Sequence, residues 1–172
     1  MDWTWGWTAV AAIATCVLAG GVFLAVWQQW ESRRRAKLQF TERRLEILNT
    51  PDFKEGLEII YKKTPSKLSE LKKEDLDKVV PVLEHLHTLG LLVKEGYAHK
   101  ELAIEAHRGK FIRCWYKLMP CICYERKERG KYGEGIEYLA KEAYKYQKKK
   151  LRKEAWVKLD GKVCEIDISK SC

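Results

Sequence analysis

The residues with the clearest chemical potential are of kinds that bind metals: His107, Cys114, Cys121 and Cys123, all on one predicted helix. Seven residues of a helix span about 10.5 Å, so Cys114 lies far from both His107 and Cys121. Zinc holds sulfur at about 2.3 Å, which brings its thiolate ligands to within about 4 Å of each other. The spacing therefore predicts buried thiols that fill a helix face, and no metal site.

Three further histidines form no catalytic pattern. His85 and His87 are two residues apart and so face opposite sides of a helix, and His99 precedes a predicted helix start. A nucleophile needs an adjacent base and an acid that orients the base, and the chain has no Gly-x-Ser-x-Gly, phosphate-loop or His-Glu-x-x-His motif. We therefore expect no enzyme and no cofactor. An enzyme whose site assembles only in space stays an alternative.

Lysines and tyrosines are interleaved between Tyr138 and Lys153. One interpretation is a basic helix that lies on anionic lipid, and a second is contact with the phosphates and bases of nucleic acid. A third interpretation is a solvated helix face. Of the two functional interpretations we favour lipid, because the N-terminal segment predicts a membrane anchor. The candidate contact residues are Lys141, Lys145, Lys148, Lys149, Lys150, Arg152 and Lys153.

The N-terminal segment has the pattern of a membrane-spanning helix. Residues 3 to 30 carry no charge, and Glu31-Ser32-Arg33-Arg34-Arg35 follows directly. Trp7 and Trp27 would lie about 30 Å apart along a helix, which is the thickness of a hydrocarbon layer. Lys and Arg favour the cytoplasmic side of a membrane. We therefore expect a single pass through the inner (plasma) membrane, with the N-terminus outside and the C-terminal domain in the cytoplasm.

Other residues refine this predicted span. A cleaved signal peptide is disfavoured, because no basic residue precedes the apolar stretch and no small-residue cleavage site follows it. Ala12, Cys16 and Gly20 recur every four residues and would let another helix approach closely, although spans are rich in such residues in any case. The residues expected at the membrane interface are Trp3, Trp5, Trp7, Trp27, Trp30, Arg33, Arg34 and Arg35.

Charge and proline patterns divide the chain into four parts. These are a transmembrane anchor (1–30), a juxtamembrane helical stalk (31–50), a cytoplasmic helical domain (51–154) and a tail or β-hairpin (155–172). Thr50-Pro51-Asp52 opens the domain with a hydroxyl cap, a first-turn proline and an acid. The net charge of the chain is +9, and its six cysteines are expected to form no structural disulfide in a reducing cytoplasm.

Apolar periodicity predicts the helices of the domain. A buried stripe runs from Leu76 to Leu86, and Leu89-Gly90 is expected to end that helix before a short extended piece at 91–93. A brief helix over 100–107, a central helix over 110–129 and a final helix from 136 to about 154 follow. Around Asp160-Gly161, β-branched residues leave a hairpin and a disordered tail as two open interpretations.

Taken together, several segments resemble a family of small single-pass membrane proteins of unknown function found in prokaryotes. The resemblance covers roughly residues 5 to 145 and implies one span plus a compact cytoplasmic helical domain, with no catalytic residue assigned. Trp115 and Arg126 gain interest from it, as a buried ring and as a partner for Glu137 or another acid. The segments that carry the resemblance are the span with its basic flank, 45–53, 83–96, 115–120 with Ile122 and Arg126, and 135–140.

The predicted fold class is therefore mostly α, with one N-terminal transmembrane helix, a compact cytoplasmic helical domain and a small C-terminal hairpin as one option. The expected function is that of an accessory, scaffold or adaptor protein that presents a basic helical domain at the inner membrane face. The expected partners are the lipid bilayer and a protein or a second copy of the chain. Anionic lipid is a further partner, and nucleic acid is a less favoured one. A membrane-tethered nucleic-acid binder and an enzyme with an unrecognised site are the alternatives.

Overall fold

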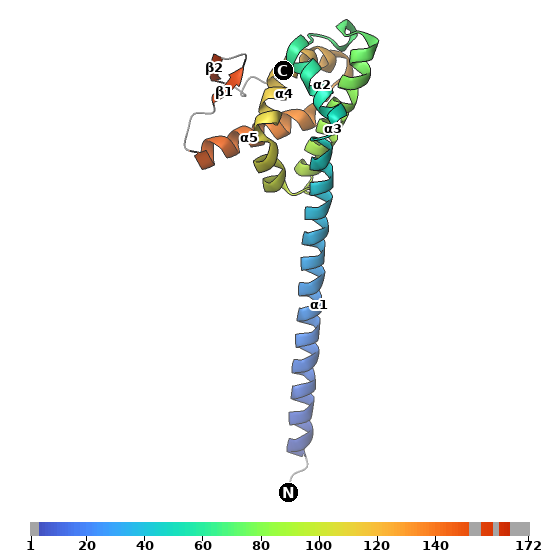
Figure 1. Cartoon of the computed structure of the whole chain (residues 1–172). Helices are drawn as coiled ribbons and strands as arrows, with labels where there is room; N and C mark the ends of the chain where they lie inside the picture. Colours follow the sequence, from blue (N-terminus) through green and yellow to red (C-terminus); the bar gives the residue numbers. More distant parts are fainter. Residues whose placement is uncertain (1–3, 152–155, 160–161, 166–172) are drawn as a thin grey trace. The chain divides into compact units, whose positions relative to one another are not determined.

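The computed structural model describes residues 4–151, 156–159 and 162–165, with side chains described at Leu18 and from residue 20 to 149 (Figure 1). The chain divides into two compact units, Met1–Lys37 and Leu38–Cys172. Helix α1 (Thr4–Ile47) contains the boundary between them. The fold is mostly α-helical, as predicted. The second unit continues with α2 (Pro51–Lys63), the 3-10 helix η1 (Leu68–Glu70), α3 (Lys73–Lys94), α4 (Lys100–Arg129), α5 (Glu134–Leu151), β1 (Trp156–Leu159) and β2 (Lys162–Glu165).

The prediction of a transmembrane helix is overturned. Within the part of the chain that is described, no helix is long and apolar enough to cross a membrane. Charged side chains follow from Glu31 onward. Residues 3 to 17 of the predicted span lie outside the described side chains.

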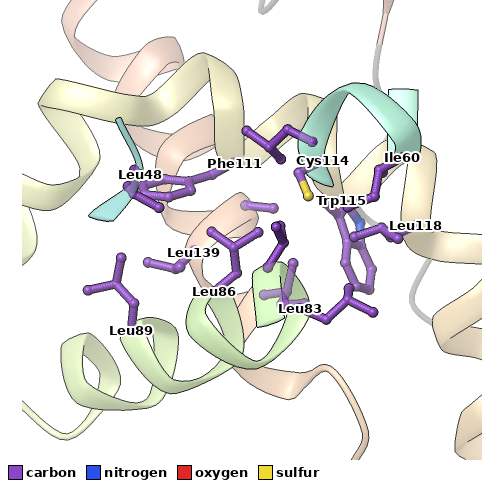
Figure 2. Close-up of a cluster of buried hydrophobic side chains, with 14 of the residues drawn as sticks. Leu48, Ile60, Leu83, Leu86, Leu89, Phe111, Cys114, Trp115, Leu118 and Leu139 are labelled. Atoms are coloured by element: carbon purple, nitrogen blue, oxygen red, sulfur yellow. The ribbon is translucent and has the colours of Figure 1, made fainter. Parts of the chain in front are cut away.

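The core of the second unit lies where α5 packs against α3 and α4, with α2 on α3 (Figure 2). Phe111 and Trp115 of α4 and Leu139 of α5 are among its largest buried side chains. Leu45, in the last turn of α1, and Leu48, which directly follows α1, are buried in the same cluster. The end of the predicted stalk therefore contributes to the core.

Two polar contacts fasten the end of α1 to later helices. The Thr41 hydroxyl is fully buried and accepts a hydrogen bond from the His99 backbone N–H at 2.7 Å. The Arg44 carbonyl oxygen lies 3.0 Å from Nε2 of His85. These contacts place the last turns of α1 against the start of α4 and the middle of α3.

Helix α2 begins as the sequence predicts. The Thr50 hydroxyl accepts from the Phe53 N–H at 3.4 Å, Pro51 is the first helical residue, and Asp52 lies in the first turn. The hydroxyl satisfies one of the N–H groups that have no partner inside the helix. The helix ends at Thr64, whose φ of 41° is left-handed.

Leu89-Gly90 does not end α3, contrary to the prediction. The helix continues to Lys94, so residues 91–93 are helical rather than extended. A Cβ built on Gly90 would lie 1.9 Å from the Gly135 carbonyl oxygen, and one built on Gly135 would lie 2.0 Å from the His87 carbonyl oxygen. Gly90 is therefore a point of close approach between α3 and α5, not a C-cap.

The two helices predicted over 100–107 and 110–129 form one element, α4. The separation survives as a break at His107, where φ is −132° and ψ is 18°. Nδ1 of His99 accepts from the Leu102 N–H at 3.3 Å and caps the start of α4. Pro120 lies inside α4 without ending it.

The C-terminal strands β1 and β2 pair antiparallel, with Trp156 opposite Glu165 and Leu159 opposite Lys162. Of the two interpretations of this region, the hairpin is the one found. The residues of its predicted turn, Asp160 and Gly161, lie outside the described residues.

Candidate functional site

A cleft of about 590 Å³ opens in the second unit, between the end of α1, the start of α2 and the middle of α3. Phe53 and Val82 are buried and give it an apolar floor, whereas the charged side chains around them are exposed. We name it the acidic cleft. Its lining residues are Ile47, Thr50, Asp52, Phe53, Glu55, Asp77, Lys78, Pro81, Val82 and His85.

Three carboxylates and one ammonium group line the acidic cleft. Nζ of Lys78 donates to Oε1 of Glu55 at 2.6 Å, and this hydrogen bond raises the pKa of Lys78. Asp52 and Asp77 have no ion-pair partner within the described part of the chain. The cleft is therefore net negative, although the whole chain has a net charge of +9.

His85 forms one wall of the cleft. Its ring meets the ring of Phe53 edge-on, with the centroids 5.7 Å apart. Because the Arg44 carbonyl can only accept, Nε2 of His85 must carry the hydrogen of their contact, and Nδ1 of the neutral ring is left as an acceptor. Burial lowers the pKa of His85, which favours this neutral form at pH 7.

Pro81 adds a backbone acceptor to the same wall. Proline has no N–H, so it cannot donate to the carbonyl of Asp77 one turn earlier in α3. Pro81 and Asp77 both line the cleft. The cleft thus combines an apolar floor with several groups that accept hydrogen bonds.

A second polar cluster joins α4 to α5 around Arg126. Its Nη2 donates to Oε2 of Glu137 at 2.6 Å and its Nε donates to the Tyr132 carbonyl at 2.8 Å. The guanidinium carbon lies 5.9 Å from the centre of the Trp115 ring, which is buried. Of the acids left open as partners of Arg126, Glu137 is the one found, and the expected burial of Trp115 is confirmed.

Substituting Glu137 with glutamine is expected to reduce the acid sensitivity of the fold. Burial raises the pKa of Glu137, but hydrogen bonds from Lys141 and Arg126 outweigh it and hold this pKa below its usual value. Such a carboxylate stabilises the fold above its unfolded pKa of about 4.3, and this stability is lost as the pH falls through the folded value. As the pH falls below about 4.3, the free energy of unfolding in urea should therefore decrease less for Glu137→Gln than for wild type. If both proteins lost the same unfolding free energy in acid, protonation of Glu137 would not be the cause.

Among the described residues, no group of three His, Cys, Asp or Glu side chains lies close enough to hold an ion. Cys114 and Cys121 are free and buried, as predicted, and burial raises their pKa values to about 12 and about 11. Cys123, however, is bonded in a disulfide. The expectation that the chain forms no disulfide is therefore wrong at this position.

The basic residues of α5 are partly neutralised by acids on the same helix. Lys141 lies 2.5 Å from Glu137, and Lys145 lies 2.8 Å from Glu142. Lys148 and Lys149 are exposed. Lys150, Arg152 and Lys153 lie outside the described side chains. Contact of this helix with lipid or nucleic acid stays a prediction.

The first unit exposes a run of large apolar side chains on α1. Trp27 lies between Phe23 and Trp30, with ring centroids 6.5 Å and 6.0 Å away, and Arg34 lies 5.8 Å from the centre of the Trp30 ring. We name this run the α1 apolar surface. Its members, each more than half exposed, are Leu18, Val22, Phe23, Leu24, Val26, Trp27 and Trp30.

The residues predicted for the membrane interface fall into two sets. Trp27, Trp30, Arg33, Arg34 and Arg35 are exposed on α1. Trp3, Trp5 and Trp7 lie outside the described side chains, as do Ala12 and Cys16 of the predicted small-residue face. A Cβ built on Gly20, the third member of that face, would have no atom within 4 Å.

Together these features define an α-helical domain with an open cleft, preceded by a helix with an exposed apolar surface. The chain belongs to the DUF4760 family, a domain of unknown function, whose pattern it matches over residues 15–143. The match includes the end of α1, the acidic cleft and the Arg126 cluster. No curated protein and no solved structure matches the chain.

The acidic cleft could not be predicted from the sequence. Three of its lining residues, Thr50, Asp52 and Phe53, were recognised only as the start of a helix. The one local signal was Pro81, which lies inside α3 beside the exposed acid Asp77. Pro81 indicates an unusual turn of α3, but it does not indicate that α1 and α2 line the same cleft.

Proposed function

We propose that this chain is an accessory or adaptor protein that acts by binding and not by catalysis. The observation that carries the proposal is the α1 apolar surface. Monomeric soluble proteins rarely expose large contiguous apolar patches, and those that do use them for interaction. We propose that α1 packs against the same helix of further copies of the chain.

The roles of the histidines support binding over catalysis. His85 contacts the Arg44 carbonyl, and Nδ1 of His87 accepts from the Gly135 N–H at 3.3 Å. His99 caps α4. The rings of His85 and His87 contact backbone groups of other segments, and the ring of His99 contacts a backbone group of its own helix. All three are structural uses of the side chain.

The distribution of the α1 apolar surface favours an assembly of more than two helices. Successive residues of a helix are turned by about 100°, so Val22, Phe23 and Leu24 point in three different directions. All three are more than half exposed. A single partner helix would cover only one of these directions, as the narrow seam of a two-stranded coiled coil does.

The experiment compares the assembly size of the full-length wild type and variants. Mild detergent is present to limit non-specific aggregation through exposed apolar residues. Sedimentation velocity should show a discrete assembly for wild type. Phe23→Glu with Trp27→Glu should yield the monomer, because each substitution places a charge where an apolar contact is expected. The matched control is Gln28→Glu with Gln29→Glu, which adds the same charge at two exposed polar positions of the helix.

A monodisperse wild-type monomer at all concentrations would overturn the proposal. So would an assembly that both double variants leave intact. Circular dichroism of each variant should match wild type, because the four substituted side chains are exposed and contribute little to the core.

A further inference from the structure

We propose that the acidic cleft is a docking site for a basic, amphipathic segment of a partner protein. The segment would place a large apolar side chain on the floor of the cleft and arginine or lysine side chains at its rim. This inference concerns the second unit and does not rest on the assembly of α1.

The shape and polarity of the cleft suit an amphipathic peptide. Phe53 and Val82 form its floor, and Ile47 is 37% exposed at its edge. Apolar surface of this kind gains free energy when a ligand removes it from water. Because most of the rim consists of exposed side chains, the cleft is open and suits a peptide better than an enclosed small molecule. Amphipathic helices dock in apolar grooves in this way.

The charges of the cleft complement those of a basic segment. Asp52 and Asp77 are exposed, and no described ion pair uses them, while the only ammonium group of the lining, that of Lys78, is held by Glu55. An arginine or lysine of the segment would find two carboxylates without displacing an internal partner. The net positive charge of the chain would repel a basic ligand elsewhere, so this charge pattern directs a basic segment to the cleft.

The polar groups of the cleft disfavour an acidic segment. The start of α2 faces the cleft, and the N-terminus of a helix favours negative charge. At the start of α2 these interactions are already made within the chain. The Thr50 hydroxyl accepts from the Phe53 N–H, and Asp52 places a negative charge in the first turn. The remaining groups of the wall, Nδ1 of His85 and the carbonyl of Asp77, accept hydrogen bonds. They match the N–H donors of arginine and lysine.

The experiment measures binding of labelled peptides to the full-length chain by fluorescence anisotropy, with a detergent-only blank. The probe is a short helical peptide with leucine on one face and arginine on the other. A second peptide replaces each arginine with glutamate, and a third replaces each leucine with serine. Only the first should bind, because it alone supplies both the apolar anchor and the positive charge.

Two double variants then test whether the first peptide binds in the acidic cleft. Asp52→Asn with Asp77→Asn should weaken binding of the first peptide by about tenfold, the effect of losing two exposed charge pairs. The matched control is Glu84→Gln with Glu128→Gln, which removes the same charge from exposed positions of α3 and α4 outside the cleft. It should leave the affinity within about twofold of wild type, since distant exposed charges are screened.

Three results would overturn the inference. These are equal binding of the glutamate peptide, equal binding of the serine peptide, and equal weakening by the two double variants. The first would show that charge does not select the ligand, the second that the apolar floor is not used, and the third that binding lies elsewhere. None of these outcomes depends on whether Phe23 and Trp27 mediate assembly, so the two proposals can fail separately.

Discussion

Replacing Gly135 with alanine should destabilise the domain by about 3 kcal/mol or more, at the upper end of the range for overpacked cores. The new Cβ would lie 2.0 Å from the carbonyl oxygen of His87. A backbone oxygen cannot rotate away as a flexible side chain can, so α3 and α5 would have to separate. Separation would open the contact between two helices that enclose the core. Urea unfolding followed by circular dichroism measures the loss.

The matched control is the same substitution at Gly109. A Cβ built there has no atom within 4 Å, and the position lies in α4. Alanine should therefore stabilise α4 by roughly 0.5 to 1 kcal/mol, the difference in helix propensity between the two residues. The two variants should thus move the unfolding free energy in opposite directions. A Gly135→Ala variant as stable as wild type would contradict the close approach of the helices.

Replacing Trp115 with alanine should cost about 3 to 5 kcal/mol of unfolding free energy, the range for large aromatic residues in cores. The ring is 2% exposed, lies among the core side chains shown in Figure 2, and carries Arg126 on one face. Its removal would leave a cavity and would also take away the surface on which the guanidinium rests. Thermal unfolding of the full-length variant measures the effect.

Two comparison variants make this result specific. Trp115→Phe should cost much less than alanine, because the Nε1–H that it removes is buried and has no acceptor among the described residues. Burying such a group without a partner is itself unfavourable, by about 1 to 3 kcal/mol. Tyr97→Ala removes an aromatic ring that is 69% exposed and should change stability by at most about 0.5 kcal/mol. If Trp115→Ala were as mild as Tyr97→Ala, the placement of the ring would be wrong.

Features set by neighbouring residues could be predicted from the sequence. The start of α2 is an example, because the hydroxyl of Thr50 and the ring of Pro51 act on N–H groups within one turn. The break at His107 is another, since two separate helices were expected over 100–107 and 110–129 and the backbone leaves the helical region at His107. Such signals act over a few residues, so a single segment contains all the information that they need.

Features that need two distant segments could not be predicted. Gly90 has the local pattern of a C-cap, and only the presence of Gly135 across the contact reveals its other use. The acidic cleft likewise needs Ile47, Phe53 and His85 to be brought together from three helices.

The position of Thr41 and Leu48 in the core has a consequence for biosynthesis. The Thr41 hydroxyl accepts its hydrogen bond from the backbone of His99. The Leu48 carbonyl accepts one from the ammonium group of Lys110 at 3.2 Å, so both partners come later in the chain. A ribosome makes the chain from its N-terminus, so the end of α1 and the turn that contains Leu48 emerge before the helices that cover them. Until α4 has been synthesised, Leu45 and Leu48 remain open to water and to chaperones, and the nascent domain cannot close.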